Sequence, residues 1–199
     1  MARDGRLLAG LGLTAMLALT GCATGVGAAM SGEELLRAAK AHNLRFKTAV
    51  AGVQAQLHRG HWESGGAYGA VPGDWLGCGD DEYQFSLDRM GPIGVLAQIE
   101  PGPLAQRLVE DGWSEVAVRE FPGVSGDVVV VGRKPSAAVT RLIVTFYEYP
   151  RGVSVTADST CAPGDSWELL QLMEGGTGAL PEYPQRETPA DVPLFESGG

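Results

Sequence analysis

The chain has 199 residues, of which 44% are hydrophobic and 20% are charged, and its formal net charge at pH 7 is −9. This acidity argues against a protein that binds nucleic-acid phosphates, and against a surface that lies flat on anionic lipid headgroups. The length and the hydrophobic content are sufficient for one globular domain with a single core.

The first 21 residues have the organisation of an export signal. Arg3 and Arg6 make the N-terminal region positively charged, and an uncharged, mostly apolar run follows from Leu7 to Leu19. A run of about a dozen residues is too short for a membrane-spanning helix, which needs roughly 20, but it fits a signal peptide. The run ends in Leu-Thr-Gly-Cys at positions 19–22, which resembles the lipobox of bacterial lipoproteins.

The lipobox resemblance implies that residues 1–21 are removed and that the thiol of Cys22 receives a diacylglyceryl group. Two acyl chains, such as palmitate, are enough for stable anchoring. We therefore expect a protein on the extracytoplasmic side of the cell membrane, tethered through residues 22–30. Residues 1–21 carry two Arg and one Asp, so the remainder has 13 basic and 23 acidic side chains and a formal charge of −10. The alternative is an ordinary signal peptide with a chance cysteine.

With Cys22 assigned to the lipid, Cys78 and Cys161 remain as a pair in an oxidising compartment. We predict a disulfide between them, which would close a long loop and stabilise a small exported domain. The alternatives are two unrelated buried thiols or a redox pair, although redox pairs are usually close in sequence.

Residues 31–60 predict a long amphipathic helix. Ser31 and Glu34 form a capping box, and apolar residues then recur at steps of three and four as far as Leu57. Gly60 follows as the expected end of the helix.

The three histidines of the chain lie in or near this helix. His42 falls on the apolar stripe, where a hydrogen-bonded core residue is more common than a ligand or a base. His58 and His61 have the spacing to share a metal on a continuing helix, but Gly60 lies between them. No clustered third ligand is evident, and we predict no metal site and no cofactor.

Residues 62–82 are rich in Gly and contain three spaced aromatic residues, Trp62, Tyr68 and Trp75. Such a stretch is either a loop that covers the edge of the core or the rim of a binding site. We favour the loop and keep the three aromatic residues as a candidate binding rim. The acidic residues at its end lack the spacing of a calcium-binding loop: Asp80, Asp81 and Glu82.

The following residues predict strands and two short helices. The helices are expected at 101–112 and 167–173, the second capped by Asp165. Alternating residues predict strands around 83–87, 116–118, 128–131, 142–146 and 153–155. We therefore expect an α+β fold with a mainly antiparallel sheet of about five strands. The long N-terminal helix and a short second helix would pack on one face of this sheet, and one disulfide would cross-link the fold.

The single globular domain is predicted to span residues 31–176. Residues 177–199 are rich in proline and acids and poor in aliphatic residues, which predicts a disordered tail.

The order of features resembles small actinobacterial lipoproteins of the LppA-like kind. The resemblance covers most of residues 31–164: an amphipathic helix, Trp75 followed by Gly-Cys at 77–78, a helix that ends in Gly-Trp at 112–113, and a last strand that runs into Cys161. The dominance of Arg over Lys and the abundance of Gly and Ala are typical of a GC-rich genome, as in actinobacteria. The resemblance implies no assigned biochemical activity.

No catalytic motif is evident in the sequence. Gly123-Val124-Ser125-Gly126 differs from the nucleophile elbow by one position, and no S-x-x-K, H-E-x-x-H or phosphate-binding loop occurs. We predict a noncatalytic binding module for an envelope protein, a glycan or a small amphiphile, with no nucleic-acid partner. The alternatives are an envelope hydrolase with a Gly-rich active-site loop and an extracytoplasmic lipid carrier.

Overall fold

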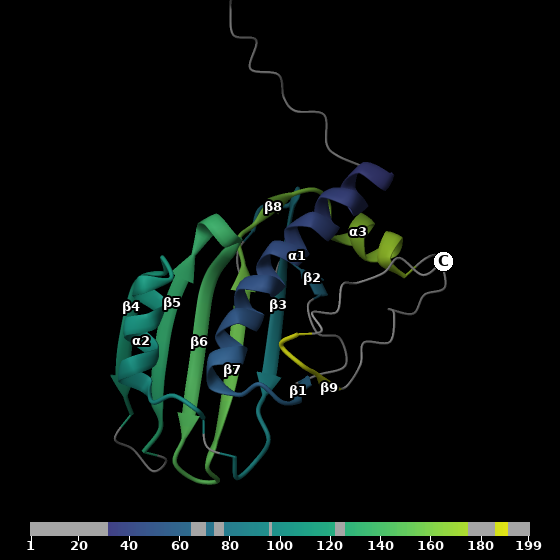
Figure 1. Ribbon diagram of the computed structural model, residues 1–199. Helices are drawn as coiled ribbons and strands as arrows, with labels where there is room; N and C mark the ends of the chain where they lie inside the picture. The colour runs from purple at the N-terminus through teal and green to yellow at the C-terminus, as the bar shows by residue number, and fades with distance from the viewer. Residues whose placement is uncertain are drawn as a thin grey trace, which may run out of the picture.

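The computed structural model describes residues 32–64, 71–73, 78–95, 97–121, 126–174 and 186–190. These residues form an α+β fold in which a large antiparallel sheet carries α1 and α2 on one face (Figure 1). This arrangement confirms the predicted fold class. The helices are α1 (Gly32–Leu57), α2 (Pro101–Glu110), α3 (Ser166–Met173) and the 3₁₀ helix η1 (Pro135–Ala137).

Five strands of seven to nine residues make up most of the sheet: β3 (Glu82–Met90), β4 (Ser114–Glu120), β5 (Val128–Lys134), β6 (Val139–Tyr147) and β7 (Gly152–Ser159). Four strands of two or three residues extend it: β1 (Trp62–Ser64), β2 (Val71–Gly73), β8 (Ala162–Pro163) and β9 (Arg186–Glu187). The prediction of about five strands holds for the long strands. It omits the short ones, because two or three residues cannot show a period of two.

The strand order is β4-β5-β6-β7-β3-β1-β9, and β2 and β8 also pair with β3. All of these pairs are antiparallel. Strands β4 to β7 follow one another along the chain as a meander, as their turn-linked spacing predicts. The earlier strand β3 then joins the meander at β7.

The core lies between the helices and the sheet. The apolar stripe of α1 forms one buried cluster with residues of α2, α3 and the strands. Along β3 the inward residues alternate as Tyr83, Phe85 and Leu87, all of them buried. Each large apolar side chain that is fully buried contributes roughly 1.5–3 kcal/mol, so α1 is held by its whole stripe rather than by one contact.

A side chain at the start of α3 accepts a hydrogen bond from the first residue of α1. Asp165 caps α3, because its side chain accepts a hydrogen bond of 2.6 Å from the backbone nitrogen of Glu168. The Glu168 carboxylate in turn accepts a 2.8 Å hydrogen bond from the backbone nitrogen of Gly32. Gly164 has φ of +134°, and a Cβ there would clash with the side chain of Leu35. Glycine therefore allows this segment to pass close to α1.

Cys78 and Cys161 form the predicted disulfide, with their Cα atoms 5.7 Å apart. The bridge joins the residues before β3 to those after β7, and these two strands are neighbours in the sheet. The cysteines are 83 residues apart in sequence. The chain-entropy model assigns about 4–5 kcal/mol to a loop of this length.

Part of the predicted tail is ordered. Arg186 and Glu187 form β9 against β1, and the Glu187 carboxylate makes a two-bond ion pair with the guanidinium of Arg89 on β3. The side chains of this pair are 2% and 9% exposed. The prediction of disorder is therefore wrong for residues 186–190. The buried Arg89 needs a counter-ion, and composition does not reveal that one lies 98 residues away.

Several predictions concern residues outside the described ranges. These are the signal peptide, Cys22, the tether, Tyr68, Trp75 and the remainder of the tail. Within the described ranges, no helix combines the length and the apolar character needed to cross a membrane.

The Arg89–Glu187 pair can be tested by its effect on stability. We expect Glu187→Ala to lower the free energy of unfolding by about 3–5 kcal/mol, because it leaves a buried guanidinium unpaired. Arg186→Ala is the matched control in the same strand: this side chain is 71% exposed, and its pair with Glu63 contributes less than about 1 kcal/mol. Urea denaturation followed by circular dichroism measures both. Equally small losses in the two variants would show that Glu187 does not hold β9 in place.

Candidate functional site

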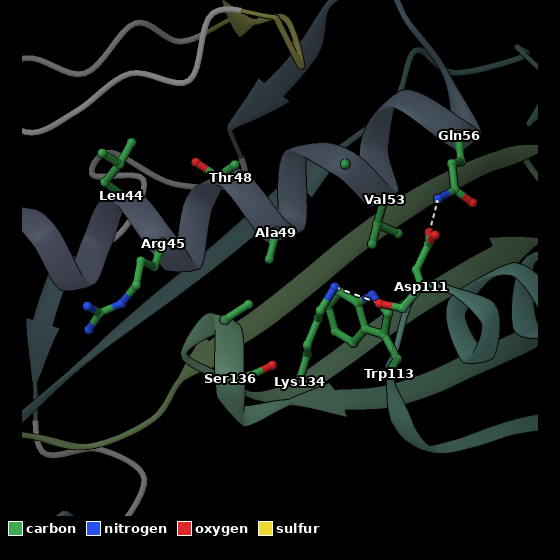
Figure 2. Close-up of a pocket in the computed structure, with 12 residues that line it drawn as sticks. Leu44, Arg45, Thr48, Ala49, Val53, Gln56, Asp111, Trp113, Lys134 and Ser136 are labelled. Atoms are coloured by element: carbon green, nitrogen blue, oxygen red, sulfur yellow. Dashed lines mark hydrogen bonds between the residues drawn. The ribbon is translucent and has the colours of Figure 1, made fainter.

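A groove of about 550 Å³ lies between α1 and the chain segments at the end of α2 and the end of β5 (Figure 2). This volume is within the range of small-molecule sites. The wall on α1 consists of Leu44, Arg45, Thr48, Ala49, Gly52, Val53 and Gln56. The opposite wall consists of Asp111, Trp113, Lys134, Ser136 and Ala137.

The α1 wall follows from the helical repeat. Arg45, Thr48, Gly52 and Gln56 recur at steps of three and four, so they share one side of the helix. This side borders the buried stripe, because Val53 is buried whereas Arg45 and Thr48 are exposed. The wall is consequently apolar at its base and polar at its rim.

The opposite wall is built around Trp113. Its side chain is only 6% exposed and belongs to the core cluster. The amino group of Lys134 lies 5.8 Å from the centre of the Trp113 ring, a distance suited to a cation–π contact. The same amino group donates a 2.7 Å hydrogen bond to the backbone oxygen of Asp111. These contacts fix the Lys134 charge at the groove.

A side-chain contact connects the two walls. The Gln56 amide nitrogen donates a 3.1 Å hydrogen bond to the Asp111 carboxylate (Figure 2). Asp111 is the acid of the groove lining, where Arg45 and Lys134 supply two positive charges. The groove thus has a positive balance on a chain whose net charge is −9. With the hydroxyls of Thr48 and Ser136 and the apolar base, this lining suits a small amphiphile with an anionic group.

His42 is a core residue with hydrogen bonds, as predicted, and it lies outside the groove lining. Its Nε2 is 3.0 Å from the backbone oxygen of Thr160 and 3.2 Å from the hydroxyl of Ser159. Its ring lies 5.9 Å from the rings of both Tyr83 and Phe85. Burial lowers the pKa of His42 below 6.5, and the hydrogen bond to Thr160 opposes this shift.

The other two histidines follow the end of α1 at Leu57. The backbone oxygen of His58 accepts a 2.9 Å hydrogen bond from the Trp62 indole, and His61 is exposed. In the part of the chain that the structure describes, neither belongs to a group of three side chains that could hold a metal. The end of the helix before His58 removes the regular spacing that a shared site would need.

Trp62 does not form a binding rim. Its side chain is fully buried and belongs to the core, so the interpretation of this residue as a rim is wrong. The indole hydrogen bond to His58 satisfies its polar atom, which explains how a tryptophan can be buried here.

The cysteine region offers no open metal site among the described residues. Cys78, Glu82 and Cys161 lie close enough together to share an ion, but the disulfide occupies both sulfurs. The Glu82 carboxylate accepts a 3.0 Å hydrogen bond from the backbone nitrogen of Gly79. Glu82 therefore stabilises the turn before β3.

No family model matches the chain, and no curated protein matches it either. Among solved structures, the chain is similar to the crystal structure of a DUF4853 family protein from Actinomyces odontolyticus ATCC 17982. The similarity covers 78% of this chain and 80% of that chain, with 17% sequence identity and a TM-score of 0.42. A likeness at this level does not establish a shared activity.

The pKa of His42 predicts sensitivity to acid. Because this pKa is lowered in the folded protein, the unfolded chain binds more protons in the window below 6.5, and stability falls as the pH decreases through that window. We expect the free energy of unfolding of the wild type to fall more between about pH 7.5 and about pH 5 than that of His42→Gln. Urea denaturation at both pH values measures this difference. His61→Gln, at an exposed site, should behave like the wild type, and identical pH dependence in all three proteins would contradict the assignment.

Proposed function

We propose that this chain is a lipid-anchored, extracytoplasmic binding module that holds a small anionic amphiphile in the groove between α1 and Trp113. The observation that carries the ligand proposal is the groove itself, with its apolar base and its excess of positive charge. The lipobox at residues 19–22 supports the anchor. The order of features supports a kinship with the LppA-like lipoproteins of actinobacteria.

The charges at the groove support an anionic ligand over a cationic one. Arg45 is exposed at the rim, where its guanidinium is available for a bidentate bond to a carboxylate or a phosphate. The Lys134 amino group is fixed on the opposite wall by its contacts with Trp113 and Asp111. An anionic group bound at either cation would exchange part of its hydration for charge-assisted hydrogen bonds.

The lining also favours binding over hydrolysis. The hydrolase alternative predicts a histidine together with acids in one concave site. None of the described histidines lines the groove, and its carboxylate, on Asp111, is hydrogen-bonded by Gln56. The lining therefore lacks the base that the nucleophile–base–orienter arrangement requires.

The filled core argues against a carrier that encloses whole acyl chains. Such a carrier needs an apolar cavity between the helix and the sheet. Phe46, Val50 and Leu57 of α1 are fully buried in one cluster with the strands below them. The groove lies beside this packed layer and is suited to a short apolar segment.

The anchor can be tested with Cys22→Ser in the full chain, expressed in an actinobacterial host. We expect the wild type to sediment with membranes and to incorporate a labelled fatty acid. The variant should lose the label, because serine cannot form the thioether, and more of it should be recovered in the soluble fraction. Two acyl chains anchor stably, so the change should be large. Unchanged labelling in Cys22→Ser would refute lipidation at this residue.

The ligand class can be tested with three probes of equal tail length: octyl phosphate, octyl glucoside and octyltrimethylammonium. Calorimetric titration below their micelle concentrations should show octyl phosphate binding at least about tenfold more tightly than the other two, which corresponds to about 1.4 kcal/mol. The phosphate should gain from Arg45 and Lys134, whereas the cation should be repelled.

Arg45→Ala should remove most of this preference, because it deletes the accessible cation of the rim. Arg37→Ala is the matched control: Arg37 is also an exposed arginine of α1, and it lies outside the groove lining. Equal binding of all three probes, or an equal effect of the two substitutions, would refute the proposed site.

A further inference from the structure

Trp167 is an exposed tryptophan on the outer side of α3. Its side chain is 67% exposed. The buried residues of this helix, Leu169 and Met173, are four positions apart and share one side of it. Because each residue turns the helix by about 100°, Trp167 falls on the opposite side. Exposure alone identifies no partner for a tryptophan, but the place of Trp167 in the fold does.

This tryptophan lies beside the start of α1. The next residue, Glu168, accepts through its carboxylate a 2.8 Å hydrogen bond from the backbone nitrogen of Gly32, the first residue of α1. Figure 1 shows α3 next to the first turns of α1. Trp167 is therefore exposed at the end of the domain where α1 begins.

The length of the chain before α1 limits the distance between this end and a lipid on Cys22. Gly32 is ten positions after Cys22, and an extended chain spans at most about 3.6 Å per residue. A chain anchored through Cys22 would thus keep the start of α1 within about 36 Å of the membrane surface. Helix α1 has 26 residues and is itself about 39 Å long. The end of the domain with Trp167 is consequently the end held near the bilayer.

The chemistry of an indole suits the boundary between lipid headgroups and acyl chains. Its rings are apolar and its N–H needs a hydrogen-bond acceptor, and the membrane–water interface satisfies both requirements. Leu170, three positions further along α3, is half-buried. Residues at this spacing are neighbours on a helix, so Leu170 adds apolar surface beside the tryptophan.

We propose that Trp167 is a membrane contact, which inserts into the interfacial region of the bilayer that holds the Cys22 lipid. This inference rests on the proposed anchor, because the anchor brings this end of the domain to the membrane. The contact orients the domain with the start of α1 toward the bilayer. The turn between β6 and β7, at the opposite end of the sheet, then faces away from it (Figure 1).

Acidic residues near Trp167 restrict the contact to the tryptophan and its neighbour. Glu33 and Glu34 are exposed in the first turn of α1, and the chain as a whole has a net charge of −9. An anionic lipid surface repels these charges, whereas a zwitterionic surface does not. Insertion of Trp167 should therefore be deepest in phosphatidylcholine and should decrease as phosphatidylglycerol is added.

Quenching of tryptophan fluorescence by brominated lipids measures this insertion. The protein used is the chain from residue 22, in which Cys22 is the free thiol once Cys78 and Cys161 are joined. Cys22 is coupled to a maleimide lipid in phosphatidylcholine vesicles, with and without bromine on the upper part of the acyl chains. We expect the brominated lipid to quench the wild type more than Trp167→Phe, and this difference is the contribution of Trp167.

Tyr149 provides the matched control at the opposite end of the sheet. Its side chain is 89% exposed, and it lies in the turn between β6 and β7. Tyr149→Trp, introduced together with Trp167→Phe, carries an exposed tryptophan far from the anchor. It should show no quenching beyond that of Trp167→Phe alone.

A weaker anchor measures the contribution of Trp167 to membrane affinity. A single myristoyl chain on Cys22 binds vesicles marginally and reversibly, so a change in affinity is visible. Trp167→Ala should lower the vesicle partition coefficient at least about fivefold, which corresponds to about 1 kcal/mol. Tyr149→Ala should leave the coefficient unchanged. Circular dichroism checks that each variant is folded.

Two results would overturn the proposal. One is equal quenching of the wild type and Trp167→Phe. The other is a quenching signal from Tyr149→Trp as large as that from Trp167, which would show that the domain has no preferred orientation. Neither result would bear on lipidation in the cell, because the lipid is attached chemically here and Cys22→Ser tests lipidation separately. The groove is also unaffected, since Trp167 is not part of its lining.

Discussion

The packing of α1 across one face of the antiparallel sheet is the interaction on which the other features depend. Its buried stripe joins strands that are far apart in sequence and fixes the angle at which the helix crosses the sheet (Figure 1). The groove lies between α1 and the chain segments that follow α2 and end β5. Trp113 and Lys134 line this groove only because the turn after α2 and the end of β5 face the exposed side of α1.

Two buried polar side chains of this fold, Arg89 and His42, are paired with residues that are distant in sequence. Arg89 meets Glu187, and His42 meets Ser159 and Thr160. Each pairing ties a helix or a central strand to a segment that arrives much later in the chain. A buried charge or imidazole that lost its partner would be costly, so these contacts restrict the chain to one arrangement.

The proposed functions use different parts of the surface. The groove lies on the helical face, whereas the anchor is proposed for Cys22, which precedes α1 in the sequence. Ligand binding and anchoring can therefore be separated by substitutions that do not overlap.

The sequence by itself determined the local structure: the amphipathic α1, the Asp165 cap of α3, the five long strands and the cysteine pair of the disulfide. These follow from periodicity, capping and composition, which act over a few residues. Only the tertiary structure decided that Trp62 is buried, that Glu187 neutralises Arg89 and that Lys134 lies over Trp113 beside α1. Those outcomes depend on which distant segments share a face of the sheet, and local patterns carry no information about that choice.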